Sequence, residues 1–362
     1  MTRRVVGGLV LVLSACSPNS SVTAPSTTAT IPSNVPPTRS PAAAAITTST
    51  VSAAATSTVS AGATSSIGAA TTPSVSGATT STTAPAATTP PASPPTTTVT
   101  SYAAGIADDP GSMATQLAVA EHTIRDPAAP ADAVAAAGRH QQLLYRRLGS
   151  HPEWQTMVRA SLPGDVLAAF DRNLAARMAV SLTKPVPPLA TVPAWRIRPP
   201  RPIEELLAYY HEAEAKTGVP WYYIAAINLV ETRVGRIQGL STAGAQGPMQ
   251  FLPSTWTSCC TGNIDDDHDA IVGAATYLKR SGAPAQIDRA ILQYNPNQTY
   301  LVMVTSYAEV MRDDPLAYRG YHAWEVFYSS SAGSMHLPVG YESPQPQPAD
   351  AWLAAHPDEK LS

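Results

Sequence analysis

The sequence predicts an all-α fold for the part of the chain that can pack a core. After Asp108, apolar residues recur at helical spacing, and Pro and Gly residues divide them into segments of helix length. No strand-like alternation of apolar and polar residues continues for more than a few positions. The 255 residues from 108 to 362 suffice for one large domain or two small ones.

The segment before Asp108 has a different composition. From Ser17 to Ala107 the only charged side chain is Arg39, and the rest is mostly Ser, Thr, Ala and Pro. Such a segment has too little apolar surface to offset the entropy of ordering it. We therefore predict that residues 16–107 are a disordered linker.

The N-terminus is typical of a secretory signal. Arg3 and Arg4 precede the apolar run Val5–Leu13, which is too short to span a bilayer. The run ends in Leu13-Ser14-Ala15-Cys16, which resembles a bacterial lipobox. The resemblance implies that residues 1–15 are removed and that Cys16 is lipidated. We expect an exported protein, lipid-anchored at the outer face of the cytoplasmic membrane or in the cell wall; the alternative is an ordinary signal with an incidental cysteine.

Helix start and stop signals divide the remainder into two helical sets. Residues 108–190 form a helical N-terminal region, residues 191–330 a second helical domain, and residues 331–362 a Pro-rich tail that we expect to be flexible. The predicted helices are Ala131–Leu148, Asp165–Leu182, Ile203–Thr217, Pro220–Val234, Pro253–Trp256, Ala270–Arg280 capped by Asp269, Pro284–Tyr294 and Gln298–Arg312. The aromatic cluster from Tyr318 to Tyr328 is assigned to the core, with sugar stacking as the alternative.

Charge and cysteine content exclude several kinds of site. All 26 acidic residues but only 20 of the 23 basic ones lie after Ala107, and a net charge of −6 there argues against a nucleic-acid partner. Asn263-x-Asp265-x-Asp267 begins like a calcium loop but lacks the required Gly and Glu further on. We predict no metal and no cofactor. Cys259 and Cys260 are adjacent, and a disulfide and a pair of free thiols are both open.

One carboxylate, that of Glu231, lies where the burial of a charge is energetically unfavourable. On a helical wheel, Glu231 falls within the apolar stripe that includes Ile224, Ile227 and Val234. Burial raises the pKa of a carboxyl group, as a general acid that works near neutral pH requires. The alternative is a helix-end Glu paired with Arg233 or Arg236.

The residues around Glu231 form a longer pattern. Glu231-Thr232-Arg233 is followed by Gly244-Ala245-Gln246-Gly247-Pro248-Met249-Gln250-Phe251-Leu252-Pro253 and later by Tyr294-Asn295. This order resembles the catalytic domain of soluble lytic transglycosylases, although Thr232 stands where that family usually has Ser. The whole chain is similar to actinobacterial, mycobacterial-type cell-wall lipoproteins that carry such a domain.

The resemblance implies a lysozyme-like fold, a peptidoglycan glycan strand as substrate, and Glu231 as the single acid and base. It implies that Thr232, Met249, Gln250, Tyr294 and Asn295 bind substrate, with plain core packing as the alternative for Met249. It also implies cleavage between N-acetylmuramic acid and N-acetylglucosamine with 1,6-anhydro ring closure. Two alternatives stay open, a hydrolytic muramidase on the same fold and a non-catalytic wall-binding lipoprotein.

Overall fold

The computed structural model describes residues 105–179 and 188–361 of the chain. The predicted signal peptide, the lipidation site at Cys16 and the linker as far as residue 104 lie outside these residues. In the described ranges no helix has both the length and the apolar character needed to cross a bilayer.

The N-terminal region is helical, as predicted. Its elements are α1 (Pro110–Arg125), α2 (Ala131–Ser150), the short 3-10 helix η1 (Pro152–Trp154), α3 (Gln155–Ser161), the 3-10 helix η2 (Gly164–Val166) and α4 (Leu167–Ala179). Asp109 caps α1 by accepting hydrogen bonds from the backbone amides of Gly111 and Ser112. The end that we predicted for the last of these helices, Leu182, lies outside the described residues.

A second helical set follows a connector, which the structure describes from residue 188 to residue 202. It comprises α5 (Ile203–Thr217), α6 (Trp221–Thr232), α7 (Pro253–Cys259), α8 (Asp267–Arg280), α9 (Ile287–Tyr294), α10 (Gln298–Asp313) and α11 (Ala317–His322). Gly218 ends α5 with a φ of 76°, a conformation that costs Gly nothing, and Pro220 directly precedes α6. The junction of α5 and α6 confirms the prediction. The end predicted for α6, Val234, is wrong by two residues because the chain becomes left-handed at Arg233, and α9 begins at Ile287 instead of the predicted Pro284.

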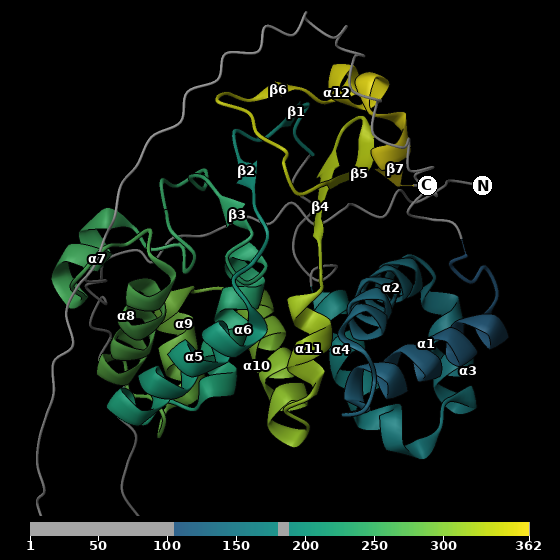
Figure 1. Cartoon of the computed structure of the whole chain (residues 1–362), viewed down its shortest axis with the longest axis horizontal. Coiled ribbons are helices and arrows are strands. Elements are labelled where there is room, and N and C mark those ends of the chain that lie inside the picture. The colour runs from purple at the N-terminus through teal and green to yellow at the C-terminus, as the bar shows by residue number, and fades with distance from the viewer. Residues whose placement is uncertain (1–104, 180–187, 362) are drawn as a thin grey trace, which may run out of the picture. The chain divides into compact units, whose positions relative to one another are not determined.

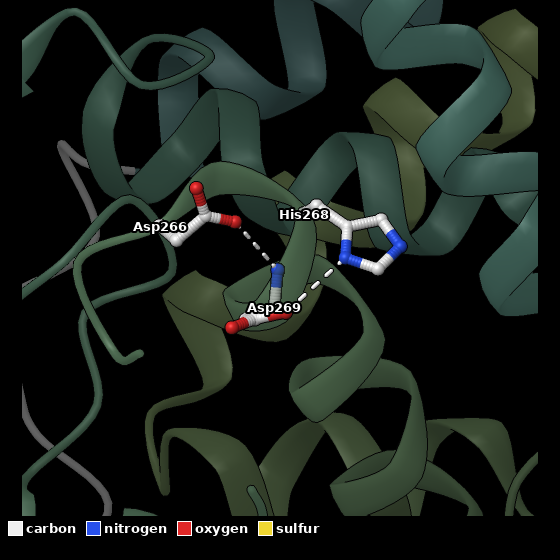
Figure 2. A group of neighbouring side chains, drawn as sticks. All are labelled: Asp266, His268 and Asp269. Atoms are coloured by element: carbon white, nitrogen blue, oxygen red, sulfur yellow. Dashed lines mark hydrogen bonds and ion pairs between the residues drawn. The ribbon is translucent and has the colours of Figure 1, made fainter. Parts of the chain in front are cut away.

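The start of α8 differs from the prediction by three residues. We expected Asp269 to cap the helix, but the cap is Asp266, whose carboxylate accepts a hydrogen bond of 3.1 Å from the amide of Asp269 (Figure 2). The run of acids offers several possible caps, and local pattern does not choose among them. The Asp269 carboxylate instead contacts His268 and accepts from the amide of Asn263.

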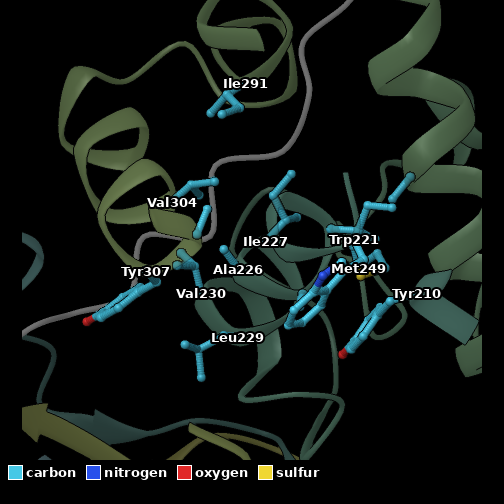
Figure 3. Packing of buried hydrophobic residues seen from close by; sticks show 14 of the residues in the cluster. Tyr210, Trp221, Ala226, Ile227, Leu229, Val230, Met249, Ile291, Val304 and Tyr307 are labelled. Atoms are coloured by element: carbon cyan, nitrogen blue, oxygen red, sulfur yellow. The ribbon is translucent and has the colours of Figure 1, made fainter. Parts of the chain in front are cut away.

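The two helical sets share one apolar core. Ala176 and Ala179 of α4 belong to the same buried cluster as Val230 of α6 and Val304 of α10. Figure 3 shows Val230 and Val304 in this cluster. At its edge, the Trp324 indole donates to the Gln141 side chain on α2 at 3.0 Å. Tyr318, Tyr321 and Trp324 are buried, which confirms the core assignment of the aromatic cluster.

The fold is not purely helical, because in the part of the chain that the structure describes three small antiparallel sheets accompany the helices (Figure 1). They pair β1 (Thr191–Val192) with β6 (Gln347–Pro348), β2 (Arg196–Ile197) with β3 (Ile237–Gln238), and β5 (Gly333–Leu337) with both β4 (Val326–Ser330) and β7 (Lys360–Leu361). Five of these strands have only two residues each, and the five-residue strands β4 and β5 do not alternate between buried and exposed positions, so no strand pattern stands out in the sequence.

The expectation of a flexible C-terminal tail is wrong for residues 333–361. Besides β5 and β7, this segment forms α12 (Ala349–Ala355) and the 3-10 helix η4 (Pro357–Glu359). Met335, Leu337 and Trp352 are buried with Val192 and Trp195 of the connector. The ordering comes from contacts between segments about 150 residues apart, which composition cannot show.

Cys259 and Cys260 are joined by a disulfide at the C-terminal end of α7, with Cα atoms 3.7 Å apart. The structure thus selects one of the two states that the sequence left open.

Candidate active site

Helix α6 carries Glu231 into the interior. Every residue of this helix from Ile224 to Thr232 is buried, and Glu231 is only 2% exposed. Figure 3 shows Ala226, Leu229 and Val230 of this helix packed within the apolar cluster. The burial that the apolar stripe predicted for Glu231 is confirmed.

The carboxyl of Glu231 has one hydrogen-bond partner among the described side chains. The hydroxyl of Tyr300, in the first turn of α10, donates to Oε1 at 2.7 Å. Burial raises the pKa of Glu231 to about 8, and the Tyr300 hydrogen bond opposes part of this rise. At pH 7 the group is therefore protonated in about ten molecules for each ionised one.

The alternative reading of Glu231 as half of a helix-end ion pair is wrong. Arg233 donates to the Leu229 carbonyl at 2.6 Å, and Arg236 donates to the His322 carbonyl at 3.0 Å. The carboxyl therefore lies in an apolar setting next to a neutral donor, which suits a group that must hold and release a proton.

The chain leaves α6 through an unusual turn directly after the acid. Arg233, Val234 and Gly235 all have positive φ, and for the β-branched Val234 at 55° this is strained backbone. Thr232 holds the turn, since its hydroxyl accepts from the Gly235 amide at 3.0 Å and donates to the Pro248 carbonyl at 2.6 Å. The strained turn thus follows immediately after Glu231.

The Gly-rich motif forms a tight loop beside that turn. Gln246 and Phe251 exchange both backbone hydrogen bonds, which closes the loop. Gly247 has a φ of 76°, and a Cβ there would lie 2.0 Å from the Ile264 carbonyl oxygen, so the position admits only Gly. Gln250 also has a positive φ, 49°. Its side chain donates to the Gly247 carbonyl at 3.0 Å, while its buried Oε1 has no partner among the described residues.

The predicted site residues lie together, linked by a chain of contacts. Thr232 bonds to the loop at Pro248, the carbonyl of Met249 accepts from the Tyr294 hydroxyl at 2.6 Å, and Tyr294 stacks on Tyr300 with ring centroids 6.5 Å apart. Tyr300 then bonds to Glu231. The Met249 side chain is fully buried beside Trp221 in the core, which matches its alternative reading as a packing residue (Figure 3).

Tyr300 is the site residue that the sequence reasoning missed. It lies six residues after Tyr294, beyond Pro296, in the first turn of a new helix. Neither a motif nor a wheel position marks it, because its contact with Glu231 joins residues 69 positions apart. Asn295, the other predicted member of the pair, is buried at the C-terminal cap of α9.

The acids before α8 have structural contacts of their own. Asp267 is buried and accepts from Arg198 at 2.5 Å and from Arg201 at 2.8 Å. Asp266, His268 and Asp269 place possible metal ligands within 4.8 Å of one another (Figure 2). The helix cap and the hydrogen bond of His268 to Glu212 at 3.1 Å account for this arrangement, so we assign no ion to it.

Comparison with known proteins gives one partial likeness. Over 126 residues the chain is 28% identical to the membrane-bound lytic murein transglycosylase F of Thiobacillus denitrificans (strain ATCC 25259 / T1). The aligned part covers 33% of this chain, and the chain spans about a quarter of that protein, 27% of its length. No family model and no solved structure matches the chain.

Proposed function

We propose that the protein is a peptidoglycan lytic transglycosylase that uses Glu231 as its only acid and base. The observation that carries the proposal is a buried carboxyl group whose pKa is raised to about 8, in contact with a neutral tyrosine donor and, within residues 105–179 and 188–361, with no cation. The partial likeness to a lytic murein transglycosylase supports the same reaction class.

In the proposed reaction, protonated Glu231 gives its proton to the glycosidic oxygen between N-acetylmuramic acid and N-acetylglucosamine. The leaving sugar departs with that proton. The resulting carboxylate then takes the proton of the muramoyl C6 hydroxyl, whose oxygen attacks the anomeric carbon and closes a 1,6-anhydro ring. One group serves both steps, and no water is consumed.

Intramolecular attack is the favoured second step because the C6 hydroxyl is already held next to the reacting carbon. Such positioning can supply about 7–11 kcal/mol relative to a free nucleophile. A hydrolase would need a second carboxylate to hold water. Of the acids that follow the motif, Asp266, Asp267 and Asp269 are bound to the α8 cap, to arginines and to backbone, whereas Asp265 is exposed to solvent.

The substrate-binding roles of Thr232, Gln250, Tyr294 and Asn295 belong to this proposal. Gln250 offers a buried Oε1 as a hydrogen-bond acceptor, whereas Thr232 and Tyr294 hold the loop that carries Gln250. We further propose that the protein acts outside the cytoplasmic membrane, anchored through Cys16.

Analysis of the products tests the proposal. Purified protein is incubated with peptidoglycan, and the fragments are analysed by mass spectrometry before and after borohydride treatment. We expect chains that end in 1,6-anhydro-N-acetylmuramic acid, one water lighter than hydrolysis products and resistant to reduction. Reducible ends would instead establish the muramidase, and intact strands would indicate a wall-binding protein.

A further inference from the structure

The side chain of Gln250, a proposed sugar-binding residue, is held by backbone from outside its own motif. Its Nε2 donates to the carbonyl of Gly247 at 3.0 Å, within the motif, and to the carbonyl of Gly239 at 3.4 Å, 11 residues earlier. Gly239 directly follows β3, which pairs with β2 (Figure 1). The Gln250 amide therefore bridges the Gly-rich loop and this small sheet.

The two carbonyl groups determine which end of the Gln250 amide is left over. A flipped amide would direct its oxygen at two carbonyl oxygens, which accept hydrogen bonds and cannot donate them. Oε1 must therefore face away from both, where it is buried and has no hydrogen-bond partner within residues 105–179 and 188–361. A buried acceptor without a partner is unfavourable. A hydroxyl or amide N–H of a bound sugar is a donor that satisfies it.

Trp195 supports the carbonyl that Gln250 uses. Its indole ring lies so close to Gly239 that a Cβ on this glycine would be 2.5 Å from Trp195 Cδ1. The indole N–H also donates to the carbonyl of Leu240 at 3.4 Å. These two contacts lie on either side of the peptide unit that joins Gly239 to Leu240, and the carbonyl of this unit accepts from Gln250. The position of the ring therefore sets the position of that carbonyl.

Trp195 is in turn fixed by the C-terminal segment. It is buried in the apolar cluster that this segment forms with the connector. Its ring packs edge-on against Tyr328 of β4, with centroids 5.9 Å apart, and its carbonyl accepts from the amide of Ser343 at 2.9 Å. The segment that the sequence predicted to be a flexible tail thus reaches Gln250 through Trp195 and Gly239.

We propose that Trp195 is a positioning residue that holds the Gln250 amide, through Gly239, so that Oε1 faces a hydrogen-bond donor of the bound glycan. The proposal rests on the proposed function for the identity of the ligand as a glycan strand. It adds that affinity for the strand depends on a residue outside the motif and on the folded C-terminal segment. Loss of Trp195 should weaken binding and leave the chemical step at Glu231 nearly unchanged.

A double-substitution cycle separates positioning from a general loss of structure. Binding of soluble glycan strands is measured in the Glu231→Gln background, in which the strands stay intact. We expect Trp195→Ala to weaken binding about five- to tenfold, the size of one hydrogen bond, and Gln250→Ala to weaken it by a similar factor. In the Gln250→Ala background, Trp195→Ala should change binding by less than about twofold, because the amide that it positions is gone.

Three further variants sharpen the cycle. Trp352→Ala removes another Trp of the same buried cluster, one that stacks on His356 at 4.4 Å, and should lower stability without weakening binding. Trp195→Phe keeps a ring against Gly239 and should retain most of the affinity. If Trp195→Ala does not fold, Gly239→Ala disrupts the same contact from the other side, and its effect must show the same dependence on Gln250.

The side-chain amide signals of Gln250 provide a readout that needs no ligand. In NMR spectra of the isotope-labelled protein, these signals are identified by their loss in Gln250→Ala. Trp195→Ala should shift them towards the position of a solvent-exposed glutamine, whereas Trp352→Ala should leave them in place. Signals that do not move in Trp195→Ala would show that the ring does not position the amide.

The binding data can also overturn the proposal. Equal weakening by Trp195→Ala with and without the Gln250 side chain would show that it does not act through Gln250. Weakening by Trp352→Ala as large as that by Trp195→Ala would show that the whole cluster affects binding through stability alone.

The same measurements separate this inference from the proposed function. Anhydro products together with additive effects of the two substitutions refute the positioning role alone. Gln250 signals that shift in Trp195→Ala, in a protein that forms no anhydro ends, refute the proposed reaction and leave the positioning of the amide standing.

Discussion

Glu231 and Asp267 are both 2% exposed, yet their surroundings differ in kind. Asp267 accepts hydrogen bonds from two guanidinium groups, those of Arg198 and Arg201, whereas Glu231 accepts one from the neutral hydroxyl of Tyr300. Cations keep a buried carboxylate ionised, while burial beside a neutral donor raises its pKa. Two equally buried acids thus have different surroundings, which are structural ion pairs for Asp267 and, for Glu231, a setting that suits the proton transfer we propose.

The two acids are also connected. Arg198, which binds Asp267, donates through Nε to the carbonyl of Gly235 at 2.9 Å. Gly235 belongs to the strained turn that ends the helix of Glu231. Through Arg198, the Asp267 carboxylate therefore supports the backbone that follows Glu231, and substitutions at the two positions should have separable effects.

The largest effect is expected for Glu231→Gln. The amide is nearly isosteric but neither donates nor retrieves the proton, so glycan cleavage should fall by at least about 10²–10⁴-fold. Release of soluble fragments from peptidoglycan measures the loss, and circular dichroism checks the fold. Cleavage within a few fold of the unsubstituted protein would remove Glu231 from the mechanism.

Asp267→Asn should lower stability and largely preserve cleavage, whereas Glu231→Gln should abolish cleavage and preserve the fold. The substitution removes the carboxylate partner of Arg198, whereas Arg201 keeps its ion pair with Glu205. Because both guanidinium groups are partly exposed, we expect the free energy of unfolding to fall by about 1–3 kcal/mol. Urea denaturation measures this loss. Cleavage per folded molecule should change far less than in Glu231→Gln; a loss of cleavage with unchanged stability would contradict the structural role of Asp267.

The pH dependence of cleavage should report the raised pKa of Glu231. Because the first step requires the protonated form, kcat/KM should decline above a pKa of about 8, by about tenfold for each further pH unit. Rates between pH 5 and 10 on one substrate preparation provide the profile. A decline centred near pH 4.5, the ordinary value for Glu, would show that burial does not control this group.

The raised pKa of Glu231 should also make the free energy of unfolding depend on pH. The folded chain keeps a proton on Glu231 that the unfolded chain loses near pH 4.5, so this group's contribution to stability is fully present below that pH. It declines as the pH rises to about 8 and then stays constant. Denaturant unfolding across this range should therefore show stability falling relative to Glu231→Gln, in which the group is absent.

The smallest effect is expected for Tyr300→Phe. Its hydroxyl favours the ionised form of Glu231, so its removal should raise the pKa of Glu231 further and move the alkaline decline to higher pH. We expect a loss in kcat of about tenfold or less, in line with one hydrogen bond. Tyr209→Phe, which loses a hydrogen bond to Glu205 instead, is the control and should leave the profile unmoved.

Sequence alone determined the local features of this protein. Gly218 and Pro220 marked the junction of α5 and α6 because a left-handed residue ends a helix and Pro suits a helix start. The apolar stripe placed Glu231 inside because helical periodicity links spacing to orientation. The tight loop at Gly247 was predictable because such turns require a positive φ, which Gly adopts readily and most other residues do not.

Only the tertiary structure decided which distant residues meet. Tyr300 reaches Glu231 across 69 positions, and β1 pairs with β6 across about 150. Local propensity carries no information on such contacts, since they form only when packing of the whole core brings the helices together. The raised pKa of the proposed acid, which depends on that burial, is therefore a property of the fold and not of the motif.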